Sequence, residues 1–182
     1  SRCAENLIYN NFGPNATFIN AFVSDKVGES IKFYSSLTDA AGSMFSTFAK
    51  TSSSIGKSKM VNQLTVDAIC QSTNFVPDLI KVDVEGAEQL VLKGISSVLE
   101  KARPYILVEV HSGIGLTIVE NTNKILEWCK AHAYQAYYLK MHSKLQSSDE
   151  VKHRGRYHTL LLPEGENYPE YLKQIPENFN LN

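Results

Sequence analysis

The fold of this chain is decided by residues 78–88, which read DLIKVDVEGAE. From Leu79 to Val82 the stretch is apolar and β-prone apart from one lysine, which predicts a short buried strand. Asp83, Glu85 and Gly86 then interrupt the apolar run and predict a turn. From Ala87 to Leu99 apolar residues recur at helical spacing, so a helix should follow the turn directly.

A second apolar strand is expected at residues 105–111, YILVEVH, after the break at Pro104. Strand, helix and strand at this length form a βαβ unit with parallel strands and a right-handed crossover. In an open parallel sheet, ligands bind outside the carboxyl ends of the strands. Asp83, Glu85 and His111 are therefore expected at the same edge of the sheet.

The remaining sequence fits a single α/β domain over residues 1–182 with a mostly parallel sheet. The last two strands are joined by too short a connection for a crossover helix and should be antiparallel neighbours. Other expected elements are helices at 2–12, 65–70 (capped by Thr65) and 117–133, strands at 17–23, 30–34, 134–139 and 157–162, a long surface loop at 35–60, and a polar tail at 164–182 with one helical turn.

Composition excludes several classes of protein. The 182 residues carry a net charge of −1, which does not suggest a nucleic-acid or membrane-surface binder. No apolar run approaches the roughly 20 residues of a membrane helix. The residues that follow Ser1 lack the apolar core of a signal peptide. Cys3, Cys70 and Cys129 form no CxxC and no zinc-type Cys/His spacing, so we expect reduced thiols, no metal site and a cytoplasmic protein. Oligomeric state stays open.

The order of elements resembles the class I S-adenosylmethionine-dependent methyltransferases, and four segments resemble their FkbM family in particular. Residues 20–29, NAFVSDKVGE, are similar to the family's NAAVSDKDGE, and residues 64–67, LTVD, to its TTLDDL. Residues 80–88 with 91–94, IKVDVEGAE and VLKG, are similar to IKIDVEGAE and VLKGA and are the most specific. The strand at 104–111 and the closing residues 158–163 also fit.

The resemblance implies a Rossmann-like methyltransferase sheet with an antiparallel last strand pair. It implies methyl transfer from S-adenosylmethionine to a hydroxyl oxygen of a small-molecule or sugar-like acceptor. The family's opening of a strand, a GxGxG turn, a helix and an acid-ended strand is missing, because none of the ten glycines sits in such a turn. We therefore expect a partial methyltransferase domain. The alternative is a catalytically inactive methyltransferase-like scaffold for protein contacts.

Candidate site residues follow from the expected edge of the sheet. By resemblance, Ser24 and Asp25 face the adenine of the cofactor, and Asp83 lies beside the sulfonium donor. The other interpretation of Ser24 and Asp25 is a side-chain-capped turn. Asp83 and Glu85 are two residues apart, so mutual repulsion should raise the pKa of one of them and suit it to act as a base. Glu85 and Glu88 could instead only stabilise the helix N-terminus. His111 is either a general base or a structural histidine.

One further residue accompanies His111. Glu109 lies two positions earlier, so the two side chains are expected on the same face of the strand. From there Glu109 either orients His111 or lies buried against another partner.

Overall fold

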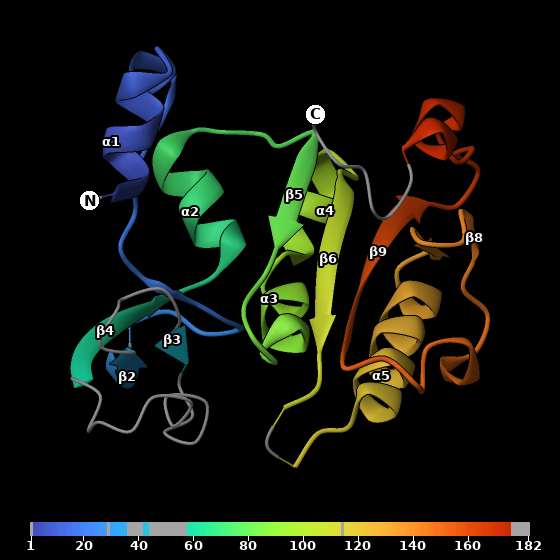
Figure 1. Ribbon diagram of the computed structural model, residues 1–182. Coiled ribbons are helices and arrows are strands. Elements are labelled where there is room, and N and C mark those ends of the chain that lie inside the picture. The colour runs from blue at the N-terminus through green and yellow to red at the C-terminus, as the bar shows by residue number, and fades with distance from the viewer. Residues whose placement is uncertain (1, 29, 36–41, 44–57, 114, 176–182) are drawn as a thin grey trace.

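The computed structural model describes residues 2–28, 30–35, 42–43, 58–113 and 115–175 (Figure 1). The chain is a mixed α/β protein whose described strands form two sheets. The surface loop expected at 35–60 lies largely outside the described residues. Two described elements fall within it, the short strand β3 (Gly42–Ser43) and the start of β4 (Ser58–Leu64).

The larger sheet has the strand order β5-β6-β9-β7-β8. Its strands are β5 (Leu79–Val82), β6 (Tyr105–His111), β7 (Tyr134–Tyr138), β8 (Ser143–Lys144) and β9 (Arg156–Pro163). β5 and β6 are parallel, as predicted. β9 is antiparallel to both β6 and β7, which confirms the predicted antiparallel pairing of the last two long strands.

The expectation of a mostly parallel sheet is wrong for the described strands. Of the described pairs, only β5–β6 and β1–β4 are parallel. The reason is that β9 lies between β6 and β7 and runs opposite to both. β6 and β7 therefore point the same way without touching, and every other pairing in the large sheet is antiparallel.

The smaller sheet has the order β1-β4-β2-β3 and lies to the β5 side of the large sheet (Figure 1). Here β2 (Ser30–Ser35) pairs antiparallel with β4 and with β3. β1 is only Phe22–Val23, although a strand was predicted over residues 17–23. Phe18 and Ile19 are 47% and 42% exposed, so this segment lacks the burial that its apolar character suggested.

Helices cover one face of the large sheet and the C-terminal segment covers the other. α3 (Glu88–Lys93), α4 (Ser96–Lys101) and α5 (Ile118–Ala131) pack on the first face. Their main core partners on the sheet are Val82, Ile106, Val108, Val110, Tyr134, Ala136, Tyr138 and Leu161. On the second face, Tyr168 and Leu172 pack against Leu160 and Leu162. Glu109 and His111 lie on the same face of β6, as predicted, with Glu109 Oε1 3.4 Å from His111 Nε2.

The helix predicted from Ala87 to Leu99 is broken at Gly94, where α3 ends and α4 follows. A Cβ at Gly94 would lie 2.3 Å from the carbonyl oxygen of Ser24, so the backbone of this position packs directly against the end of β1. Asp67 stabilises the break, because its carboxylate accepts hydrogen bonds of 2.9 Å from the backbone N–H groups of both Ser97 and Val98. These long-range contacts have no signal in the local apolar spacing.

The remaining helices agree with the sequence. α1 is Arg2–Tyr9, and α2 is Val66–Thr73 with Thr65 as its N-cap. Thr117 caps α5, accepting a 3.2 Å hydrogen bond from the backbone N–H of Glu120. The short 3-10 helices are Gly13–Asn15, Ser148–Glu150 and Glu170–Gln174, the last being the single turn predicted for the tail. Across the described part of the chain, no helix is both long enough and apolar enough to cross a membrane.

Candidate functional site

A tight turn brings the ends of β5 and β6 together. Glu85 and Gly86 have φ angles of 51° and 97°, the left-handed region that favours glycine. A Cβ at Gly86 would lie 3.4 Å from the Cα of Gly113, so the turn after β5 packs against the loop after β6. A non-glycine residue such as Glu85 in this region is uncommon and is often found at functional sites.

His111 is held in place by a buried carboxylate. Its Nδ1 lies 2.9 Å from Oε1 of Glu88, whose side chain has no exposed surface. The amide of Asn121 donates to Glu88 Oε2 at 3.0 Å and to the backbone oxygen of His111 at 2.8 Å. The backbone N–H of Gly86 donates to the same carboxylate at 3.0 Å. The ring of His111 is therefore held at Nδ1 by a carboxylate that Asn121 and Gly86 fix in turn.

The other ring nitrogen of His111 has no hydrogen-bond partner among the described residues. Nε2 is buried, and the nearest carboxylate oxygens are Glu109 Oε1 at 3.4 Å and Glu85 Oε2 at 3.7 Å. Burial alone lowers the pKa of His111, but the hydrogen bond to Glu88 and the charges of Glu85, Glu88 and Glu109 outweigh it, so the pKa lies above its ordinary value.

Glu109 is buried and surrounded by basic side chains. Its Oε2 lies 3.7 Å from Lys81 Nζ and 3.2 Å from His158 Nε2, and its Oε1 lies 3.3 Å from Arg156 Nη1. The antiparallel register of β6 and β9 places Glu109 opposite His158 and His111 opposite Arg156. Glu109 is thus buried against several other partners, which is the second of the two alternatives, and His111 is oriented instead by its hydrogen bond with Glu88.

The charged side chains around His111 and Glu109 form a cluster, and Asp83 lies at its exposed side. Its Oδ2 lies 3.1 Å from Lys81 Nζ, and its side chain is 45% exposed. Partial burial favours the neutral acid, but the hydrogen bond and charge of Lys81 outweigh it and hold the pKa of Asp83 below its ordinary value. The expectation that repulsion raises a pKa in this pair is therefore wrong for Asp83, because Lys81 supplies a positive charge beside it.

Ser24 and Asp25 lie outside this network. Ser24 is buried, donates from Oγ to Gln63 Oε1 at 3.0 Å, and accepts from the backbone N–H of Lys26 at 3.2 Å. This is the side-chain-capped turn that the sequence offered as the alternative. Asp25 is exposed. Within the described residues, no hydrogen bond or ion pair connects either of them with Asp83, Glu85 or His111.

Sequence reasoning missed several members of the cluster. The sequence singled out Asp83, Glu85, Glu109 and His111 as candidates for this site, and the structure adds Lys81, Glu88, Asn121, Arg156 and His158. Lys81 left a signal, because it is the one charge inside an otherwise apolar strand. His158 left a weaker one, since it alternates with buried residues of β9.

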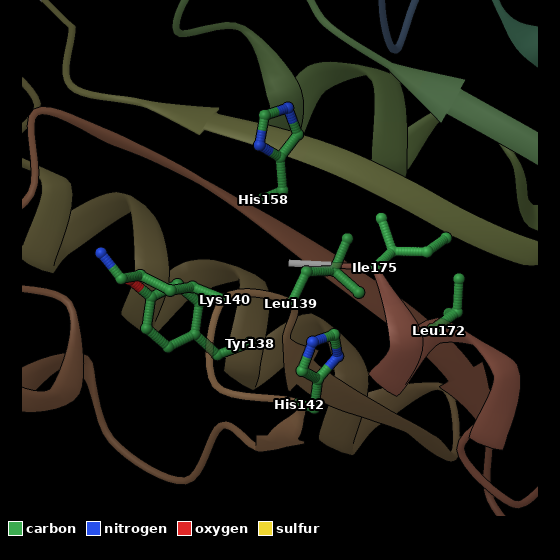
Figure 2. A pocket seen from close by; sticks show the side chains of 7 residues that line it. All are labelled: Tyr138, Leu139, Lys140, His142, His158, Leu172 and Ile175. Carbon is green, nitrogen blue, oxygen red and sulfur yellow. The ribbon is translucent and has the colours of Figure 1, made fainter. Parts of the chain in front are cut away.

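A cavity of about 230 Å³ opens beside the cluster, on the face of the large sheet opposite the helices (Figure 2). His158 connects the cavity with the cluster, because it lines the cavity and its Nε2 contacts Glu109. Figure 2 shows the second histidine of the cavity, His142, whose Nδ1 lies 2.7 Å from the hydroxyl of Tyr168. The remaining lining residues are Tyr138, Leu139, Lys140, Leu172 and Ile175.

Comparison with known families gives one match. The family model described as "Methyltransferase FkbM domain" matches residues 3–136. The chain belongs to the FkbM methyltransferase family. The FkbM match contains the β5–turn–α3 segment, β6 and all of the residues singled out from the sequence. No curated protein and no solved structure matches this FkbM-family chain.

Proposed function

We propose that this FkbM-family chain transfers a methyl group from S-adenosylmethionine to a hydroxyl oxygen of a small-molecule or sugar-like acceptor. The observation that carries the proposal is the buried Nε2 of His111, which faces Glu109 and Glu85 without a hydrogen bond at the carboxyl ends of β5 and β6. Ligands of open α/β sheets bind at this edge.

The residues present fit the cationic end of the donor. S-adenosylmethionine supplies an electrophilic methyl group on a sulfonium cation when it is bound. Asp83 is half-exposed, and its low pKa keeps it ionised at neutral pH, so it suits a cation beside the cluster. The hydroxyl of Ser24 is engaged by Gln63, so Asp25, which is exposed, is the better candidate for an adenine amine.

A hydroxyl must lose its proton as it attacks a methyl group. We assign the proton to the pair formed by Glu85 and His111, whose Oε2 and Nε2 are 3.7 Å apart. Glu88 and Asn121 contribute by fixing the ring of His111, so that Nε2 keeps its direction. Lys81 keeps Asp83 ionised and is a positioning residue.

The cavity beside His158 is the proposed acceptor site. Its wall combines apolar side chains with two histidines, which suits a partly apolar molecule that carries hydroxyl groups. The contact between His158 and Glu109 would place such a hydroxyl next to the cluster.

The test is methyl transfer from donor labelled on its methyl group to a panel of hydroxylated small molecules and sugars. The protein is used with any sequence that its gene encodes before Ser1. Asp83→Asn and His111→Gln should each reduce transfer at least tenfold, because both lie in the cluster. Asp78→Asn is the matched control, since this exposed aspartate precedes the other end of β5. Equal activity in all three variants would contradict the proposal, and no donor binding at all would favour the inactive scaffold.

A further inference from the structure

Three side chains of the cluster offer ligand atoms close to one another. One carboxylate oxygen each from Asp83 and Glu109 and one ring nitrogen of His111 all lie within 4.8 Å of one another. Asp83 follows β5, whereas Glu109 and His111 share one face of β6. The parallel pairing of β5 and β6 therefore holds the three side chains close to one another. Separations of this size fit ligands that surround one small cation.

The orientation of His111 adds an independent observation. Nδ1 is engaged by Glu88, so Nε2 is the ring nitrogen that faces Glu109 and Glu85. The side chain is 8% exposed and Nε2 has no hydrogen-bond partner in the described chain. A buried ring nitrogen between two carboxylates requires a positive charge at that point, which either a proton on Nε2 or a bound cation supplies.

We propose that Asp83, Glu109 and His111 form a binding site for one divalent cation. One imidazole nitrogen and two carboxylates are a donor set that suits a first-row ion such as Mn²⁺ or Zn²⁺. The hydrogen bond from His111 Nδ1 to Glu88 is the arrangement in which metal-binding histidines are commonly held. No metal site was predicted from the sequence, because these three residues have none of the Cys/His spacing of a zinc motif.

Three basic side chains compete with the cation for the same carboxylates. Arg156 Nη1 and His158 Nε2 lie 3.3 Å and 3.2 Å from the two oxygens of Glu109. The ammonium of Lys81 lies 3.1 Å from Asp83 Oδ2 and 3.7 Å from Glu109 Oε2, but it does not satisfy Nε2 of His111. The side chain of Lys81 is 42% exposed, so it can turn into solvent when an ion binds. Removal of this lysine charge should therefore raise the affinity for the ion.

The role of the ion rests on the proposed function, whereas its binding does not. A cation on Nε2 uses the lone pair that would otherwise accept a proton. In the loaded protein the proton of the acceptor hydroxyl is therefore left to Glu85, whose side chain is 44% exposed and next to His111. The cation would hold the hydroxyl oxygen and make the proton easier to remove.

The experiment is a titration of the 182-residue chain with Mn²⁺ alone, followed by the loss of the free-ion electron paramagnetic resonance signal. We expect one ion per chain, with affinity lowered at least tenfold by Asp83→Asn and raised several-fold by Lys81→Met. Asp149→Asn and Lys152→Met are matched controls, because these two residues form an exposed aspartate–lysine pair elsewhere, with Nζ and Oδ1 3.2 Å apart. Neither control should change the affinity.

Three results would overturn the inference. These are no saturable binding, binding that Asp83→Asn leaves unchanged, and binding that Lys81→Met leaves unchanged or weakens. The first would mean that the basic side chains around Asp83 and Glu109 already balance the charge of the cluster, and the second that the ion occupies other surface carboxylates. Methyl transfer that persists in EDTA, together with no Mn²⁺ binding, would remove the metal site and leave the proposed function intact. Stoichiometric Mn²⁺ binding without methyl transfer would support the metal site and contradict the proposed function.

Discussion

Nδ1 of His111 and Oε1 of Glu88 lie 2.9 Å apart, and this contact joins the end of β6 to the first residue of α3. Glu88 is fully buried and His111 nearly so. A charge in such a place is stable only when it is paired and hydrogen-bonded, which here requires Asn121 and the backbone of Gly86 as well. The candidate site and the packing of α3 on the sheet therefore depend on the same carboxylate.

Removal of the Glu88 carboxylate should destabilise the fold. Glu88→Ala leaves His111 and Asn121 without their buried partner, and the loss of one member of a buried pair costs about 3–5 kcal/mol of unfolding free energy. Urea unfolding followed by circular dichroism measures it. Glu100→Ala is the control, since Glu100 is exposed on α4 and should change stability by less than about 0.5 kcal/mol. A similar, small effect of both substitutions would show that the buried contact does not stabilise the fold.

Gly94 should tolerate no side chain. In Gly94→Ala the new Cβ would lie 2.3 Å from the backbone oxygen of Ser24, so α3, α4 or the end of β1 must shift. We expect a loss of about 1–3 kcal/mol in unfolding free energy. Gly155→Ala is the matched control, because a Cβ there meets nothing within 4 Å. Thermal unfolding of both variants checks the prediction, and equal melting temperatures would contradict the described packing.

The two described thiols should differ in reactivity. Cys129 is buried in the core, and burial raises its pKa to about 12, so at pH 8 it stays protonated and shielded. Cys70 is only partly buried, although burial and the charge of Asp67 raise its pKa too. In a Cys3→Ser background, iodoacetamide labelling followed by mass spectrometry should modify Cys70 first and Cys129 only in denaturant. Labelling of both thiols at one rate would place Cys129 outside the core.

The sequence predicted those helices and strands whose formation depends on residues close together in the chain. β5, α5 and the N-cap at Thr65 follow from apolar periodicity and capping chemistry within a few residues. The break at Gly94 could not be predicted in this way, since it depends on Ser24 and Asp67, which are distant in sequence.

The candidate site was predicted only in part for the same reason. Asp83, Glu85 and His111 were placed at one edge because parallel strands bring their carboxyl ends together, and the structure confirms that proximity for His111 and Glu85. The partners that set their charge are not local. Arg156 reaches the cluster only because β9 pairs with β6, and Glu88 was seen only as a helix N-terminal residue. A pKa argument from two neighbouring carboxylates therefore failed for Asp83, which is paired with Lys81.

The most direct test of the central claim is the affinity for S-adenosylmethionine, whose sulfonium carries the charge that Asp83 is proposed to face, measured by calorimetry on the protein with any residues that its gene encodes before Ser1. The claim is that the edge formed by the ends of β5 and β6 holds the methyl donor. Asp83→Asn should weaken binding at least tenfold, while Asp78→Asn, at the opposite end of β5, should leave it unchanged. Equal affinities for the wild-type protein and both variants would contradict the claim.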